Sequence, residues 1–148
     1  MMSGTLARPL APQRSKTLAA LLAALLGVFG VHWWYLGRRY AWVPTLFSLG
    51  MLVWAQTFDS WWDNAAFLLL IIPILDGFIE ALILALKPDA WFDGRYNPGS
   101  GEVNKTGWGP VLVAILTTFL GGTLFVFWIA MIVMHIYTAM GWLDGLAI

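Results

Sequence analysis

Four long apolar segments constrain this chain more than any other feature of its sequence. They cover residues 18–36, 41–58, 65–86 and 111–137, and few charged residues interrupt them. A helix needs roughly 20 predominantly apolar residues to cross the hydrocarbon core of a bilayer. Only 11% of the residues are charged, whereas soluble domains have about 25%. The sequence therefore predicts an all-α, polytopic integral membrane protein in which the last three segments are transmembrane helices.

The first apolar segment has two interpretations. As one helix, residues 18–36 would extend about 28 Å at about 1.5 Å per residue, which is enough for a fourth span. Alternatively, Gly27, Gly30 and Gly37 interrupt it, and the segment enters the membrane and returns on the same side, as protein-covered backbone can. Basic residues favour the cytoplasmic side. All eight Lys and Arg residues lie on the cytoplasmic side if the segment is re-entrant. Only five lie there if the segment is a fourth span with the N-terminus outside. The charges therefore favour re-entry, and both interpretations place the C-terminus outside.

The polar stretches divide the chain into four parts. Residues 1–16 form a basic tail that we expect to be disordered, and residues 17–86 form the main membrane domain. Residues 87–109 are rich in Gly, Pro and Asn and predict a cytoplasmic loop. Residues 110–148 predict a C-terminal transmembrane helix and a short interfacial tail.

Two patterns concern the shape and packing of the apolar helices. Pro73 removes a backbone donor and frees the carbonyl of Leu69, which predicts a kink. Ala19, Ala23 and Gly27 are spaced four apart, a pattern that lets helix backbones approach closely in lipid. The alternative for the second pattern is a helix that is simply rich in alanine.

Asp76 and Glu80 are the sharpest chemical feature, because they interrupt the third apolar segment. Side chains four residues apart share one face of a helix. A charge at the bilayer centre costs about 2.5–3.5 kcal/mol on insertion scales, so such acids usually face a partner or a cavity. One hypothesis is that they pair with groups at the end of the first segment, namely His32, Tyr35, Arg38 or Arg39. The other is that they form a proton or cation site, with His32 as a third member.

The residue inventory argues against several classes of function. The chain has no cysteine, which excludes disulfides, thiolate metal sites and thiol nucleophiles. Its formal net charge of zero argues against nucleic-acid binding. The sequence contains no phosphate-binding glycine loop, no cluster of metal ligands at a recognisable spacing and no nucleophile–base set. We therefore predict no catalytic residue, no cofactor and no metal site. The expected partners are the lipid bilayer and either further copies of this chain or another membrane protein.

A motif at the end of the first segment is more specific than any apolar helix requires. It consists of Gly27, Gly30, His32, Tyr35, Leu36, Gly37 and Arg38. Together with the preceding Ser15-Lys16 and Leu/Ala-rich run, it resembles the TM-two domain family, small membrane proteins named for two transmembrane segments. The resemblance extends to about Leu86, and Asp76 matches an aspartate in the family's second apolar segment. Trp33 departs from the family, which has arginine there.

The resemblance implies residence in a membrane and no common enzymatic activity. The stretch from Asp89 to Gly99 and the last apolar segment are similar to an extended bacterial form of the family. We therefore expect a non-catalytic protein of the bacterial inner membrane that acts by helix packing or interaction within the membrane. The alternative is a small proton- or cation-conducting component that uses Asp76 and Glu80.

Overall fold

The computed structural model describes residues 12–146, and all regular secondary structure among them is helical. The elements in chain order are α1 (Lys16–Leu26), the 3₁₀ turn η1 (Gly27–Phe29), α2 (Val31–Leu36), α3 (Trp42–Ala55), α4 (Ala65–Leu68), α5 (Ile71–Leu86), α6 (Asp89–Tyr96) and α7 (Trp108–Ala139). The all-α prediction is confirmed.

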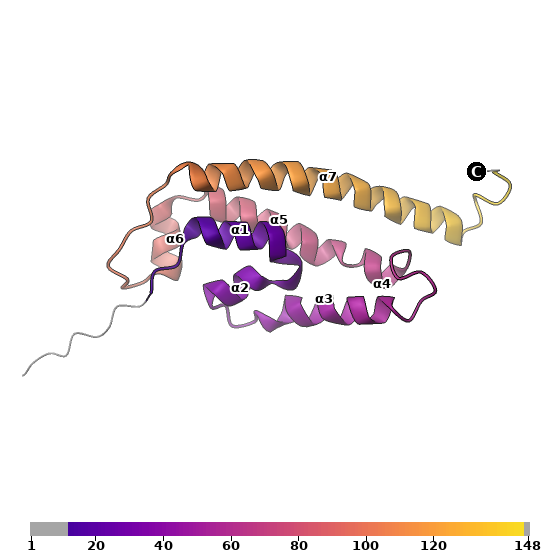
Figure 1. Cartoon of the computed structure of the whole chain (residues 1–148), viewed down its shortest axis with the longest axis horizontal. Helices are drawn as coiled ribbons and strands as arrows, with labels where there is room; N and C mark the ends of the chain where they lie inside the picture. Colours follow the sequence, from indigo (N-terminus) through magenta and orange to yellow (C-terminus); the bar gives the residue numbers. More distant parts are fainter. Residues whose placement is uncertain (1–11, 147–148) are drawn as a thin grey trace, which may run out of the picture.

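Helix α5 is the central element of an elongated bundle. It packs against α1 and η1 and, on another side, against α7 (Figure 1). Helix α1 starts beside α6 and runs antiparallel to α5, and α7 extends along the whole length of the molecule. We call the end of the bundle that carries α6 the α6 end. The opposite end holds the loop between α3 and α4 and the last turn of α7.

The first apolar segment is not one continuous helix. Helix α1 ends at Leu26, η1 follows, and Gly30 adopts a left-handed conformation with φ of 67° before α2 begins. The chain reverses there, so α2 runs back toward the α6 end (Figure 1). This reversal is the shape that a re-entrant segment requires, and it differs from the straight helix required of a fourth span.

Small residues bring α1 and α5 into backbone contact. The side chains of α1 that face the core are alanines, and a Cβ atom built on Gly27 would lie 2.5 Å from Cα of Gly77 in α5. Ala81 and Ala85 continue this small surface along α5 at intervals of four residues and are buried. The four-residue spacing in α1 therefore lies at a close helix crossing.

Two of the expected transmembrane segments are long and apolar enough to cross a membrane. They are the 22 residues of Ala65–Leu86 and the 32 residues of Trp108–Ala139. The third expected span, residues 41–58, is helical only from Trp42 to Ala55. Its 14 residues extend about 21 Å at about 1.5 Å per residue. The structure therefore shows two candidate spans, and α3 is a shorter apolar helix.

The kink expected near Pro73 is a full break in the helix. Helix α4 ends at Leu68 and α5 begins at Ile71. Pro73 has no N–H to donate to the Leu69 carbonyl, which accepts instead from the N–H of Ile72 at 3.1 Å. Because the Ile72 N–H is used there, the Leu68 carbonyl is free to accept a hydrogen bond of 2.9 Å from Nε1 of Trp128 in α7. The Trp128 side chain of α7 thus provides a hydrogen-bond donor for the free backbone carbonyl between α4 and α5.

The stretch expected to be a loop, residues 87–109, contains helix α6. Asp89 lies in its first turn and Arg95 in its last turn, where each charge interacts favourably with the helix dipole. Most of the Gly, Pro and Asn residues follow α6, whereas Pro88 precedes it and Gly94 lies within it. Of the expected disordered tail, residues 1–11 lie outside the described part, and residues 12–15 lead into α1 at Lys16.

Candidate polar site between α2 and α5

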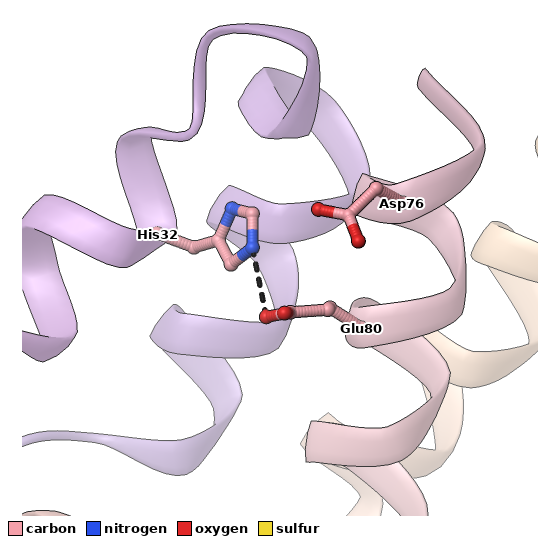
Figure 2. Close-up of side chains that lie close together, drawn as sticks. All are labelled: His32, Asp76 and Glu80. Atoms are coloured by element: carbon pink, nitrogen blue, oxygen red, sulfur yellow. Dashed lines mark hydrogen bonds and ion pairs between the residues drawn. The ribbon is translucent and has the colours of Figure 1, made fainter. Parts of the chain in front are cut away.

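Glu80 is the centre of a polar cluster inside the bundle. Its Oε2 lies 3.0 Å from Nε2 of His32, and its Oε1 accepts a hydrogen bond of 2.6 Å from the Arg38 guanidinium. His32 is completely buried, whereas the Arg38 side chain is 29% exposed. One carboxylate on α5 therefore binds two side chains of the glycine-rich turn, as Figure 2 shows for His32.

Glycines of the motif place His32 opposite Glu80. Gly30 begins α2 in a left-handed conformation, and a Cβ atom there would lie 2.2 Å from Cγ of Pro44. Gly37 ends α2, also left-handed, and its N–H bonds to the last turn of that helix. A side chain at either position would be strained. The short α2 is thus held at both ends with His32 directed toward α5.

Asp76 lies beside this cluster but has no ion pair or hydrogen bond with the described residues. One possible ligand atom from each of His32, Asp76 and Glu80 lies within 4.8 Å of the other two. Figure 2 shows the three side chains pointing toward one another from α2 and α5. Asp76 also lines an open, mostly apolar groove of about 290 Å³, together with Trp33, Val43, Pro44, Phe47, Ile72 and Pro73.

The charges of the cluster do not balance. Two carboxylates face one guanidinium, so the group carries one net negative charge when both acids are ionised and His32 is neutral. Burial lowers the pKa of Arg38, but hydrogen bonds from Arg38 to Glu80 and Tyr96 outweigh burial, and the pKa is raised above its usual value. Arg38 therefore stays charged. Because charge in a low-dielectric environment is costly, the cluster is suited to taking up one further positive charge.

The other two groups expected to pair with the acids lie elsewhere. The hydroxyl of Tyr35 accepts a hydrogen bond of 2.7 Å from the backbone N–H of Ser15, at the start of α1. The guanidinium of Arg39 lies 5.5 Å from the ring centroid of Tyr40 and contacts neither acid. Of the motif side chains, His32 and Arg38 thus contact α5. Tyr35 binds the backbone directly before α1, and Leu36 is buried in the core.

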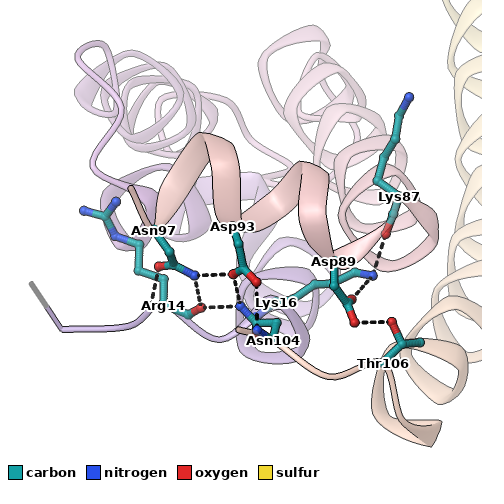
Figure 3. Close-up of polar contacts among 8 residues, drawn as sticks. All are labelled: Arg14, Lys16, Lys87, Asp89, Asp93, Asn97, Asn104 and Thr106. Carbon is teal, nitrogen blue, oxygen red and sulfur yellow. Dashed lines mark hydrogen bonds and ion pairs between the residues drawn. The ribbon is translucent and has the colours of Figure 1, made fainter. Parts of the chain in front are cut away.

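A second polar cluster, which sequence reasoning missed, lies at the α6 end (Figure 3). Lys16 is almost completely buried and pairs with Asp89 at 2.9 Å. Asp89 also accepts a hydrogen bond from Thr106. The start of α1 and the stretch directly before α7 are therefore both bound to the first turn of α6.

The last turn of α6 completes this second cluster. Asn97 accepts a hydrogen bond from the N–H of Arg14 and donates to its carbonyl, at 2.7 and 2.9 Å. Asn104 donates its backbone N–H to Asp93 at 2.7 Å. The four-residue spacing of Asp89, Asp93 and Asn97 on one face of a helix is the sequence signal that could have revealed the cluster.

Both acids of this cluster are held in their charged form. Burial would raise the pKa of Asp89, but hydrogen bonds from Lys16 and Thr106 outweigh it, so its pKa is lowered. The pKa of Asp93 is lowered in the same way, by hydrogen bonds from Asn97 and Asn104. The cluster fastens the start of α1 to α6 most firmly when both carboxylates are ionised.

A third polar contact joins the opposite end. Nδ1 of His135 in α7 lies 2.8 Å from Oδ1 of Asp63, in the loop that follows α3. Both side chains are partly exposed. This pair fastens the loop to α7.

Comparison with known proteins supports one part of the chain. No curated protein and no solved structure matches it. The family model of the TM2 domain matches residues 12–61, which is about a third of the chain and covers α1, α2 and α3. The match ends before Asp76, so the alignment of that residue with the family's aspartate stays a prediction. The expected resemblance is confirmed for this segment, because residues 12–61 match the TM2 domain.

Proposed function

We propose that this protein is a non-catalytic, multi-pass protein of the bacterial inner membrane that acts by helix packing within the membrane. Its α1–α2 hairpin enters the membrane and returns on the same side, and α3, α5 and α7 each cross the membrane. The observation that carries the proposal is the attachment of the hairpin to α5 through Glu80, which binds both His32 and Arg38. A hairpin that carries buried polar groups needs such partners in lipid.

The distribution of charge supports an orientation with the α6 end in the cytoplasm. Arg14 and Arg38 both bond to Tyr96 of α6, and Lys16 pairs with Asp89. The seven basic residues in the described part of the chain belong to this end: Arg14, Lys16, Arg38, Arg39, Lys87, Arg95 and Lys105. The opposite end carries Asp59, Asp63 and Asp144 instead. An excess of Lys and Arg marks the cytoplasmic side, so the C-terminus lies outside.

Cysteine accessibility tests this topology, because the chain has no cysteine of its own. Asp59 and Glu102 are both exposed and lie at opposite ends, whereas Ser100 is buried and would resist labelling for that reason alone. In intact cells, an impermeant maleimide should label Asp59→Cys and leave Glu102→Cys unlabelled. Glu102→Cys should react after the membrane is permeabilised. Labelling of Glu102→Cys in intact cells would refute the orientation.

The surface of α7 supports a role in interaction with other membrane components. Large apolar side chains such as Phe119 and Val126 are mostly exposed along it. Lipid alone can cover them, and so can a further copy of the chain or another membrane protein. Single-molecule photobleaching of a fluorescent fusion in native membrane particles measures the copy number. Single-step bleaching would exclude the homo-oligomer and leave lipid or a different partner.

The second candidate function is a proton- or cation-conducting component. It is favoured by Asp76, which lies beside His32 and Glu80 without a bonded partner. Proton flux into liposomes distinguishes the two functions. Conduction predicts flux in the wild-type protein that Asp76→Asn abolishes while the protein stays folded. Packing predicts no flux in either protein.

A further inference from the structure

We propose that His32, Asp76 and Glu80 form a binding site for one divalent transition-metal ion, and that Arg38 leaves Glu80 when the ion binds. The site is separate from the packing role proposed above. It rests on the geometry, the burial and the charges of these four side chains.

The geometry brings three suitable donors together. The ligand atoms lie within 4.8 Å of one another, and metal–ligand bonds of about 2.0–2.2 Å to imidazole and carboxylate require only modest side-chain rotations to close. Asp76 and Glu80 share one face of α5, and His32 faces them from α2 (Figure 2). Both helices are fixed near this point, α5 by the contact of Gly77 with Gly27 and α2 by Gly30 and Gly37.

The burial of His32 is the second observation that points to an ion. Its side chain is fully buried, with Nε2 toward the carboxylates, and Nδ1 has no hydrogen-bond partner among the described residues. In most metal sites and catalytic sites the bond made by one ring nitrogen selects the tautomer. In this structure the contact with Glu80 places a proton on Nε2. In the other tautomer, with the proton on Nδ1, Nε2 offers its lone pair to a metal.

The charge balance selects a divalent ion in place of Arg38. With Arg38 present and both carboxylates ionised, the cluster has one net negative charge. A divalent ion in the same position neutralises both. A desolvated cluster is most stable when its charges cancel, so the exchange of Arg38 for the ion is favourable.

Arg38 is able to leave without becoming a buried, unpaired charge. It lies on the loop after Gly37, is partly exposed, and donates a second hydrogen bond of 3.2 Å to the hydroxyl of Tyr96. Its guanidinium also lies 4.9 Å from the ring centroid of Trp33, at the distance of a cation–π contact. These contacts are available to Arg38 after Glu80 is released.

The donor set identifies the class of metal. One imidazole and two carboxylates suit Zn²⁺, Mn²⁺, Fe²⁺ or Co²⁺, whereas Ca²⁺ and Mg²⁺ prefer oxygen ligands throughout. The full chain contains only two histidines and no cysteine. Spectroscopic assignment of a bound metal is therefore simple.

The test is titration of the full-length protein with Co²⁺ in detergent, followed by competition with Zn²⁺. The protein is purified without a polyhistidine tag, and circular dichroism checks that each variant is folded. A saturable visible absorption band at one Co²⁺ per chain is expected. Loss of a group that only supports a metal ligand costs about 10–100-fold in metal affinity. Loss of a ligand itself, in Asp76→Asn or His32→Gln, should therefore weaken Co²⁺ binding by at least about 10-fold.

Arg38→Gln gives the decisive comparison, because it removes a competitor for the site and should tighten Co²⁺ binding. The matched control is the double variant Asp63→Asn/His135→Gln, which removes the other histidine–aspartate pair and should bind Co²⁺ as the wild type does. The absence of a saturable band would overturn the proposal. Unchanged binding in Asp76→Asn, or unchanged or weaker binding in Arg38→Gln, would also overturn it.

Discussion

The backbones of Gly27 and Gly77 are in direct contact, since a Cβ atom on Gly77 would lie 2.7 Å from Cα of Gly27 and 2.9 Å from the Ala23 carbonyl oxygen. Atoms of the main chain cannot rotate away as the end of a side chain can. This contact determines how close α1 lies to α5. The hairpin that carries His32 is attached to the bundle at this crossing.

Gly27→Ala is therefore expected to destabilise the protein. Overpacking of a close contact costs typically about 1–3 kcal/mol. The matched control is Gly50→Ala in α3, where a new Cβ atom would meet nothing within 4 Å. That substitution should stabilise the helix by about 0.5–1 kcal/mol. Reversible unfolding in mixed detergent micelles measures both changes, and equal effects of the two substitutions would contradict the close crossing.

Gly30→Ala tests the turn before α2. The alanine would carry the strain of a left-handed conformation and would also place Cβ 2.2 Å from Cγ of Pro44. Gly99→Ala carries the strain alone, because its Cβ would meet open space, at a cost of about 1–2 kcal/mol. We expect Gly30→Ala to lower the thermal midpoint much more than Gly99→Ala, and Pro44→Ala to restore part of the loss. If the two glycine variants unfold alike, Pro44 does not restrict the turn.

Trp128→Phe separates the two roles of the indole at the helix break. A phenylalanine keeps the stacking on Phe67, whose ring centroid lies 5.2 Å away, but leaves the Leu68 carbonyl without its donor. An unsatisfied buried acceptor costs about 1–3 kcal/mol. The control is Trp108→Phe at the exposed start of α7, which should be close to neutral. Equal stability of the two variants by chemical unfolding would show that the Leu68 carbonyl finds another donor.

The cluster at the α6 end predicts a loss of stability in acid. Because the pKa values of Asp89 and Asp93 are lowered in the folded protein, their contribution is fully present above the ordinary aspartate pKa of about 3.9. It is lost as the pH falls through the lowered folded values. The thermal midpoint should therefore begin to drop as the pH falls toward about 4 and should continue to drop at lower pH. The Asp89→Asn/Asp93→Asn variant should be less stable at neutral pH and should lose much of this drop. Asp144→Asn, in the C-terminal tail, should retain it.

The helical class and the interruption of the first apolar segment were predictable, because both follow from local composition. Glycines that interrupt an apolar run show where a helix can break, and Pro73 shows where α5 must begin. The length of α3 was not predictable in the same way. Residues 41–58 contain no charged residue, but the helix ends at Ala55, directly before the polar Gln56 and Thr57.

The contents of the polar site were only partly predictable. The i and i+4 spacing identifies Asp76 and Glu80 as neighbours, but nothing local determines which of the candidate partners reaches them. Glu80 binds His32 and Arg38, whereas Tyr35 and Arg39 point elsewhere. His32 and Tyr35 lie on α2, whereas Arg38 and Arg39 lie in the turn after Gly37. The three-donor set His32, Asp76 and Glu80 joins residues more than 40 positions apart, so no sequence spacing could reveal it.

The glycine crossing also has a mechanical consequence. Because Gly27 and Gly77 leave no space between their main chains, α1 cannot slide across α5, and any relative motion has to be a rotation about that point. The Lys16–Asp89 pair and the His32–Glu80 pair both lie on the α6 side of this contact, with Lys16 at the far end of α1. A rotation of α1 about the glycine contact therefore displaces Lys16 farthest and opens the Lys16–Asp89 pair first.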